Sequence, residues 1–181
     1  MICTGNYSST TDMYNRCSIS GDRGKKIGYS GPYYSKLAPK KDFWLIYDGN
    51  IGKISEEENN KFYIIEYWNQ VLSQLDPQTV YDELDNNILL CYETENQFCH
   101  RHVVAAWFEL FLNVQISEVQ YSANGLKFLK REDYYKDYLE IKKYLEQLII
   151  DSMNIDIDYY TSINDWYLSK IGNKKIVQST I

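Results

Sequence analysis

The sequence predicts an α/β fold: a small Rossmann-like or flavodoxin-like sheet, mostly parallel, flanked by helices and followed by a C-terminal helical extension. Three observations carry this prediction. Residues 88–93 (ILLCYE) form an apolar run bounded by turn residues, which is typical of a strand buried on both faces in a parallel sheet. Segments with a helical period lie on either side of it, over residues 59–75 and from Phe98 onward. A further long helical pattern begins at Leu126.

The first forty residues combine one short strand pattern with a long loop. Residues 1–4 are apolar and predict a first strand, which Gly5 and Asn6 end. Residues 5–41 are rich in Gly, Ser, Tyr and Lys and lack a sustained period, so we expect an ordered loop. Loops of such length in compact domains are usually functional or disordered. Residues 43–49 fit either a strand or the end of a helix.

Two helix patterns precede the central strand. The first has an apolar stripe at steps of three or four residues, made by Phe62, Ile65, Trp68, Leu72 and Leu75. Asp76 as N-cap and Pro77 at the first helical position then predict a second, short helix. After the central strand, Asn96 is the expected N-cap of the helix that begins near Phe98.

The C-terminal third predicts one strand and then helices. Residues 114–122 alternate between apolar and polar and predict a strand, residues 126–150 have a helical period, and residues 165–175 predict one more short helix. We therefore expect an α/β domain over residues 1–122 and a helical extension over residues 123–181 packed on it. The tyrosine-rich helices of the extension are a surface through which the chain could form oligomers.

The composition bounds the class of protein. The chain has 181 residues, of which 44% are hydrophobic and 18 are tyrosine, enough for one domain with a sizeable core. No apolar run approaches the roughly 20 residues that span a bilayer, and no signal peptide is apparent, so we expect a cytoplasmic protein without a membrane partner. Four cysteines in such a setting indicate free thiols, with a Cys91–Cys99 disulfide as the less favoured alternative.

The net charge of −6 is unevenly distributed. Residues 16–41 contain seven basic residues and one acid, a balance of +6, whereas residues 42–99 contain twelve acids and two lysines, a balance of −10. A basic segment in an acidic protein can mark an anion site. The alternative is a solvated loop whose lysines neutralise acids nearby.

Reactive side chains gather around the end of the central strand. Cys91 and Glu93 share one face of it, about 6.6 Å apart along the strand. Ligands of open α/β sheets bind outside the carboxyl ends of the strands. We expect Cys99, His100 and Arg101 in the first turn of the next helix, where free amides and the helix dipole favour an anion.

These residue types suggest catalytic roles. A helix N-terminus lowers the pKa of a thiol, so Cys99 is a candidate nucleophile, with Cys91 as the other candidate. His100 suits a general acid or base, and Glu93 could orient it or act as the base. The structural alternatives are that Cys91 and Cys99 fill the core, and that Arg101 pairs with one of the many acids of the preceding region. His102 points to another side of the helix, as an exposed residue or one that supports the site.

No metal or other cofactor is predicted. The four residues Cys91, Glu93, Cys99 and His100 could all supply ligands, and three would suffice for a catalytic zinc ion. However, the spacing matches no common zinc motif, so a metal is only a minor alternative. The sequence also contains no P-loop or dinucleotide fingerprint, and no glycine-rich loop follows a cysteine as a cysteine phosphatase or sulfurtransferase would require.

The basic loop supplies the predicted ligand contacts. Its lysines would hold phosphate and its tyrosines would stack on a base. The residues expected to bind the anionic ligand, besides Arg101, are Ser18, Ser20, Lys25, Lys26, Tyr29, Tyr33, Lys36 and Lys40.

Several separated blocks resemble one known family. They are residues 18–21 (SISG), 29–40 (YSGPYYSKLAPK), 63–80 (YIIEYWNQVLSQLDPQTV) and 88–107 (ILLCYETENQFCHRHVVAAW). Together they are similar to the domain-of-unknown-function 488 family, and the C-x-E and C-H-R pattern of residues 91–93 and 99–101 is the most specific element. The resemblance covers residues 1 to about 120 and implies a small intracellular α/β protein, without a settled activity or cofactor to carry over.

Three functions follow as hypotheses. The leading one is an enzyme, or a former enzyme, that binds a small anionic ligand related to a nucleotide or nucleoside at the Cys91, Glu93, Cys99, His100 and Arg101 site, with the basic loop closing over it. The second is a protein associated with nucleic acid, which would bind a short single strand through the same loop and lose affinity steeply with salt. The third is a protein-binding regulatory module in which the cysteines are structural.

Overall fold

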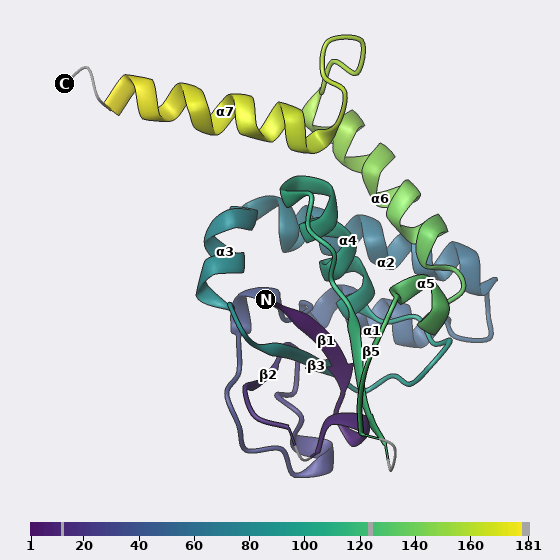
Figure 1. The fold of residues 1–181 in the computed structure, drawn as a ribbon. Coiled ribbons are helices and arrows are strands. Elements are labelled where there is room, and N and C mark those ends of the chain that lie inside the picture. The colour runs from purple at the N-terminus through teal and green to yellow at the C-terminus, as the bar shows by residue number, and fades with distance from the viewer. Residues whose placement is uncertain (12, 123–124, 179–181) are drawn as a thin grey trace.

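The computed structural model describes residues 1–11, 13–122 and 125–178, and over these residues the protein has an α/β fold with seven α-helices flanking a five-stranded sheet (Figure 1). The strands run in the spatial order β2-β3-β1-β4-β5, and all are parallel except β5, which pairs antiparallel with β4. The predicted fold class is confirmed. The strands are β1 (Cys3–Asn6), β2 (Arg16–Ser18), β3 (Ile88–Cys91), β4 (Glu118–Ser122) and β5 (Gly125–Leu129).

The helices are α1 (Lys41–Asn50), α2 (Glu56–Gln70), α3 (Pro77–Glu83), α4 (His100–Leu112), α5 (Arg131–Tyr134), α6 (Tyr138–Met153) and α7 (Ile163–Gln178). Short 3-10 turns at Ser8–Thr10, Lys25–Ile27, Ser35–Leu37 and Leu72–Gln74 join them. No helix in the described ranges is both long and apolar enough to cross a bilayer. In Figure 1, α7 extends away from the sheet, beyond the end of α6.

The strand β3 lies between β1 and β2 and is buried along its whole length. Its last residue, Cys91, is in register with Asn6 at the end of β1, and Leu90 is in register with Ser18 at the end of β2. Because all three strands are parallel, their carboxyl ends meet at the same edge of the sheet. This edge is where the predicted site residues begin.

The alternation of side chains along β3 separates the two faces of the sheet. Leu89 belongs to the main core formed with the helices, whereas Ile88 and Leu90 pack in a second cluster with Tyr7, Tyr29 and Tyr92. The segment after β1 closes tightly over this second face. A Cβ on Gly5 would lie 2.7 Å from the methyl carbon of Thr10, so only glycine fits there.

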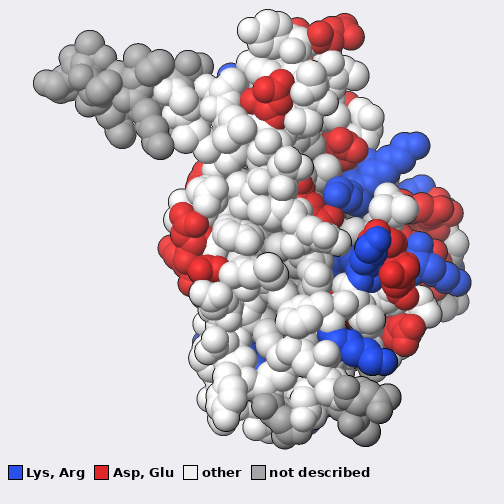
Figure 2. Space-filling model, viewed as in Figure 1, with Lys and Arg blue, Asp and Glu red and all other residues white. Residues whose placement is uncertain are grey.

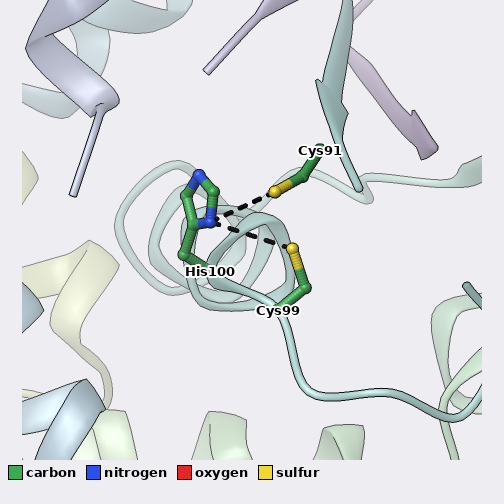
Figure 3. Close-up of side chains that lie close together, drawn as sticks. All are labelled: Cys91, Cys99 and His100. Atoms are coloured by element: carbon green, nitrogen blue, oxygen red, sulfur yellow. Dashed lines mark hydrogen bonds between the residues drawn. The ribbon is translucent and has the colours of Figure 1, made fainter. Parts of the chain in front are cut away.

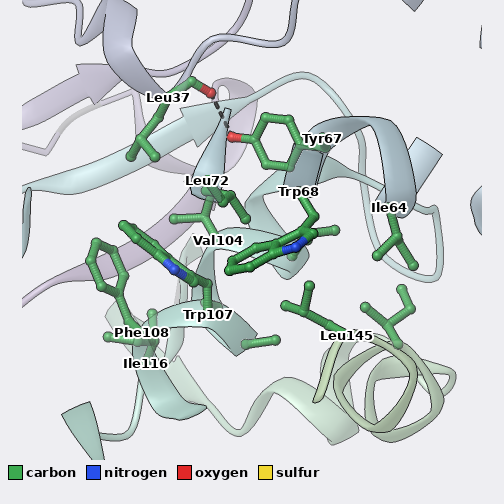
Figure 4. Packing of buried hydrophobic residues seen from close by; sticks show 14 of the residues in the cluster. Leu37, Ile64, Tyr67, Trp68, Leu72, Val104, Trp107, Phe108, Ile116 and Leu145 are labelled. Atoms are coloured by element: carbon green, nitrogen blue, oxygen red, sulfur yellow. Dashed lines mark hydrogen bonds between the residues drawn. The ribbon is translucent and has the colours of Figure 1, made fainter. Parts of the chain in front are cut away.

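The main core joins the sheet to the helices, including those of the predicted extension. Trp68 of α2 and Trp107 of α4 are almost fully buried and lie near each other (Figure 4). The Trp68 indole donates a hydrogen bond of 2.9 Å to the hydroxyl of Ser152 on α6, and Leu145 of α6 is completely buried. Burial of such large apolar side chains is the main stabilising contribution to a core.

Some predicted elements have different boundaries in the structure. The long loop of residues 5–41 contains the three-residue strand β2, and residues 43–49 lie in the helix α1. The helix expected from Leu126 was wrong at its start, because residues 126–129 belong to β5 and pair with β4. The predicted domain boundary after residue 122 therefore lies in the β4–β5 hairpin, with residues 123–124 outside the described ranges.

The N-cap predicted at Asp76 is confirmed and gives a first testable effect. Its carboxylate accepts a 2.8 Å hydrogen bond from the Thr79 amide, and the hydroxyl of Tyr167 also donates to it at 2.8 Å. We expect Asp76→Ala to lower the free energy of unfolding by about 1–2 kcal/mol, the upper range for a lost N-cap. Asp76→Asn keeps an acceptor and should lose less than half of that in urea denaturation. Equal losses for the two variants would refute the capping role.

Candidate functional site

The end of β3 and the start of α4 bring three reactive side chains together. The Nδ1 atom of His100 lies 3.5 Å from the sulfur of Cys91 and 3.8 Å from the sulfur of Cys99 (Figure 3). The three side chains are buried, with exposures of 3%, 2% and 4% for Cys91, Cys99 and His100. All four cysteines are free thiols, as predicted. We name Cys91, Glu93, Cys99, His100 and Arg101 the strand-end cluster.

The backbone places Cys99 and His100 differently from the prediction. The helix α4 begins at His100, and Cys99 is its N-cap residue with extended backbone and no side-chain cap hydrogen bond. Asn96, the predicted N-cap, instead adopts a left-handed turn with φ of 56°. The expected cap was wrong because residues 94–97 form a separate turn before the helix. The Cys99 thiol is therefore free to face His100 and Cys91.

The imidazole of His100 is fixed in orientation. Its Nε2 atom lies 3.0 Å from the backbone carbonyl oxygen of Ile19, the residue that follows β2, and its ring packs edge-on against Tyr67. Because a carbonyl oxygen can only accept, Nε2 is the donor of this hydrogen bond. The Nδ1 atom is therefore the one that faces the two thiols.

Burial and neighbouring charges shift the pKa values of the two thiols in opposite directions. Burial alone would raise the pKa of Cys99, but the hydrogen bond from the Cys91 thiol and the charges of Arg101 and His100 hold that pKa well below its usual value. Burial raises the pKa of Cys91 well above its usual value, and the adjacent Cys99 reinforces the effect. Burial of the imidazole alone would lower the pKa of His100, but the charge of Cys99 outweighs this effect and raises that pKa. Both shifts favour the charged forms of this pair, a thiolate at Cys99 and an imidazolium at His100.

Glu93 forms the boundary between this cluster and solvent. Its side chain is 38% exposed, but its Oε2 atom is buried and has no hydrogen-bond partner among the described residues. Burial of the carboxyl group, with the nearby charge of Cys99, raises the pKa of Glu93 to about 7.

Arg101 is fully buried and faces Glu93 with one unused nitrogen. Its Nε donates to Glu118 at 3.2 Å and its Nη2 donates to the hydroxyl of Tyr134 at 3.3 Å. Its Nη1 atom has no hydrogen-bond partner within the described ranges and lies 4.0 Å from Oε2 of Glu93. The buried Nη1 of Arg101 and the buried Oε2 of the partly exposed Glu93 thus form an ion pair at a distance longer than a hydrogen bond.

The ionic network that Arg101 forms with Glu118 and Arg131 was not predicted from the sequence. Glu118 of β4 accepts from Arg101 and, at 3.1 Å, from Arg131, while Arg131 also donates to Nδ1 of His102 at 2.9 Å. The exposed position considered for His102 was wrong, because the side chain is completely buried and stacks on Tyr135. Burial, together with the charges of Arg101 and Arg131, lowers the pKa of His102 well below its usual value. Glu118 follows the buried Ile116 at a step of two residues, and this alternation was the available signal of an inward-facing acid.

The structure does not bring the predicted loop residues to the strand-end cluster. The hydroxyls of Ser18 and Ser20 are buried and bonded to Tyr7 at 2.6 Å and 2.7 Å. Tyr29 packs on Tyr7 and donates to the carbonyl of Arg16, on the face of the sheet opposite Leu89. Because neighbouring residues of a strand point to opposite faces, Tyr92 turns toward this loop and Cys91 away from it.

The predicted loop cations are exposed, and some have other partners. Lys36 pairs with Glu83 at 2.7 Å, Lys26 lies over the ring of Trp44, and Arg23 lies over the ring of Tyr33. Lys25 and Lys40 are exposed. In Figure 2, acidic side chains gather over α3, and basic and acidic side chains intermix over the side formed by α5 and α6. Neutralisation of an acid by a loop lysine, one of the two sequence interpretations, thus applies to Lys36.

A surface hollow of about 690 Å³ lies on the loop face of the sheet. Its walls include Tyr7, Arg16, Tyr29 and Tyr92. Arg16 contributes little free hydrogen-bonding capacity, since its terminal nitrogens donate to the carbonyls of Thr11 and Tyr7. This hollow is a separate candidate site from the strand-end cluster.

The strand-end cluster also has the composition of a metal site. The ligand atoms of Cys91, Cys99 and His100 all lie within 4.8 Å of one another. Thiolate and imidazole are the donors that zinc prefers in proteins. The arrangement can therefore act through a reactive thiol with its histidine or through a bound ion.

Comparisons with known proteins add no relative. No protein-family model matches the chain, no curated protein matches it, and no solved structure matches it. The fold defines the class as an α/β protein with a mostly parallel sheet, and the function rests on the site itself.

Proposed function

We propose that the chain is an enzyme, or the descendant of one, that binds a small anionic ligand related to a nucleotide or nucleoside at the strand-end cluster. The observation that carries the proposal is a pair of buried atoms without a hydrogen bond, Nη1 of Arg101 and Oε2 of Glu93, which form only a 4.0 Å ion pair beside the two thiols and His100. Buried polar groups in folded proteins are almost always hydrogen-bonded. Polar groups without a hydrogen bond next to reactive side chains support a site that a bound ligand completes.

The charge of the interior favours an anion. Arg101 and Arg131 share one buried carboxylate, that of Glu118. The surplus positive charge is expensive in a medium of low dielectric constant unless an anion approaches it. Arg101 presents its unused N–H groups toward the half-exposed side of the cluster, where Glu93 lies.

An aromatic side chain near the cluster supports a nucleoside-like ligand. The half-buried Tyr47 packs against Phe98 at a ring distance of 5.8 Å, and burial, followed by the charges of Glu56 and Glu93, raises the pKa of Tyr47. The partly exposed ring of Tyr47 is the aromatic group that we propose for contact with a base.

The loop face supports a second candidate, binding of a short single strand of nucleic acid. The hollow there is lined by tyrosines, and Lys25 and Lys26 are exposed near it on the same loop. Stacking and phosphate contacts of this kind bind single strands with little sequence preference. Because Arg16 and Tyr29 already have partners, fewer groups are left for a ligand than at the strand-end cluster.

Calorimetric titration of the metal-free protein with inorganic phosphate and with a nucleoside monophosphate tests the leading proposal. We expect Arg101→Lys to keep a cation beside Glu118 but to lose the fork of the guanidinium. The affinity should then fall at least about 10-fold, because a hydrogen bond to a charged group contributes about 1.5–3 kcal/mol. Glu93→Gln should not weaken binding, since it removes a negative charge.

The matched controls are Lys25→Ser and Lys26→Ser, whose side chains are exposed in the basic loop. They should leave both affinities unchanged. If they weaken binding steeply while Arg101→Lys has no effect, the loop face is the ligand site and the leading proposal is wrong. Thermal midpoints of the variants without ligand show whether Arg101→Lys is folded.

A further inference from the structure

Three donor atoms between the end of β3 and the start of α4 lie within 4.8 Å of one another, and their two sulfur–nitrogen separations match a tetrahedral metal site. With zinc–sulfur bonds of about 2.3 Å and a zinc–nitrogen bond of about 2.0–2.1 Å, each sulfur of a tetrahedral site lies about 3.6 Å from the nitrogen. The two sulfur–nitrogen distances here are 3.5 Å for Cys91 and 3.8 Å for Cys99. The side chains point toward one common centre from a strand end and a helix start (Figure 3). An ion could therefore bind with only small side-chain movements.

The second ring nitrogen of His100 has a hydrogen-bond partner of the kind found in metal-binding histidines. Histidines that bind metals usually donate their second ring N–H to a carbonyl or carboxylate, which fixes the tautomer and the ring orientation. The hydrogen bond of 3.0 Å from Nε2 to the carbonyl oxygen of Ile19 does this. It leaves Nδ1 as the nitrogen that can present a lone pair, and Nδ1 is the atom that faces both sulfurs.

Two charged side chains near the thiols each have one buried atom without a hydrogen bond. Nη1 of the fully buried Arg101 and Oε2 of Glu93 have no hydrogen-bond partner among the described residues. Structural zinc ions usually have four protein ligands, whereas catalytic zinc ions keep one position for water or substrate. Three protein donors beside an acid and a cation match the catalytic arrangement.

The other two cysteines show that burial alone does not produce this arrangement. Cys3 and Cys17 are also buried, at 6% and 5% exposure, but neither belongs to a group of three ligating side chains within the described ranges. Two thiolates and an imidazole favour a borderline-soft ion such as Zn²⁺ over Mg²⁺ or Ca²⁺, which prefer oxygen ligands.

We propose that Cys91, Cys99 and Nδ1 of His100 bind one Zn²⁺ ion, with the fourth position open beside Glu93 and Arg101. The assignment deepens the proposed function, on which its catalytic meaning rests, because an oxygen of the anionic ligand or a water molecule would take the open position. Binding of the ion itself is measurable without any turnover.

Titration of the chelator-treated protein with Co²⁺ and Zn²⁺ tests the assignment. We expect one equivalent of Co²⁺ to produce a sulfur-to-cobalt charge-transfer band, which Zn²⁺ then abolishes. In competition with a chromophoric chelator, Cys91→Ser and Cys99→Ser should weaken zinc affinity more than about 100-fold, beyond the 10–100-fold typical of residues outside the ligand set. The matched controls Cys3→Ser and Cys17→Ser should keep the wild-type affinity.

Nitrogen-detected NMR of the wild-type histidines supplies a test that needs no variant. The chain has two histidines, so Zn²⁺ should shift the ring signals of His100 strongly and those of His102 little. No charge-transfer band at one equivalent, or no selective shift of His100, would overturn the assignment. So would equal loss of affinity in the Cys3 and Cys91 variants.

The two proposals fail separately. Zinc uptake without binding of phosphate or nucleoside monophosphate to the zinc-loaded protein would reject the proposed function and leave the zinc site. Anion binding that depends on Arg101 in a protein that takes up no zinc would reject the zinc site and leave the anion site.

Discussion

Replacement of Glu118 by glutamine is expected to lower the free energy of unfolding by about 3–5 kcal/mol, the range for a buried ion pair that loses one partner. The Glu118 side chain has no solvent exposure and pairs with both Arg101 and Arg131. The hydroxyl of Thr4 also donates to it. The glutamine would leave Arg131 without a carboxylate and Arg101 with only the 4.0 Å ion pair to Glu93.

The control for this effect is Glu95→Gln. Glu95 is exposed in the turn before α4, and surface substitutions of this kind usually change stability by less than about 0.5 kcal/mol. Urea denaturation of both variants and the wild type measures the difference. A loss below about 1 kcal/mol for Glu118→Gln would mean that the two arginines are hydrated or paired differently from the arrangement described.

Truncation of Leu145 to alanine should cost about 2–5 kcal/mol, as for other large apolar side chains removed from a core. Leu145 has 0% exposure on α6 and lies close to Trp68 of α2 (Figure 4). The effect tests whether the C-terminal helices share the core of the sheet or are merely attached to it. A shared core predicts the full loss in a single cooperative transition.

Leu139→Ala is the matched control on the same helix. Leu139 is 60% exposed, so its truncation removes little buried surface and should change stability by less than about 0.5 kcal/mol. Similar small changes for both leucines in thermal denaturation would contradict a shared core.

The elements predicted correctly are those with strong local signals. The central strand was predictable because an apolar run between turn residues has few other solutions, and α3 was predictable because Asp76 and Pro77 mark a helix start. The strand β5 was missed because its five residues adjoin a much longer helical pattern. Its pairing with β4 depends on the hairpin and not on its own sequence.

The residues of the strand-end cluster were predictable from the sequence, but the ion pairs that surround them were not. The alternation along β3 and the position of the next helix place Cys91 and His100 together, and the contact at 3.5 Å agrees with this. The pairing of Arg101 with Glu118 joins α4 to a later strand, so no local pattern reveals it. The same alternation puts Tyr92 on the opposite face from Cys91, which separates the tyrosine loop from the cluster.

X-ray absorption of the zinc-loaded wild-type protein tests most directly whether Cys91, Cys99 and His100 bind the same ion. We expect a zinc ion with two sulfur neighbours at about 2.3 Å and nitrogen or oxygen neighbours, including one histidine, at about 2.0–2.1 Å. A first shell of nitrogen and oxygen alone, or a single sulfur, would show that Cys91, Cys99 and His100 do not meet at one ion.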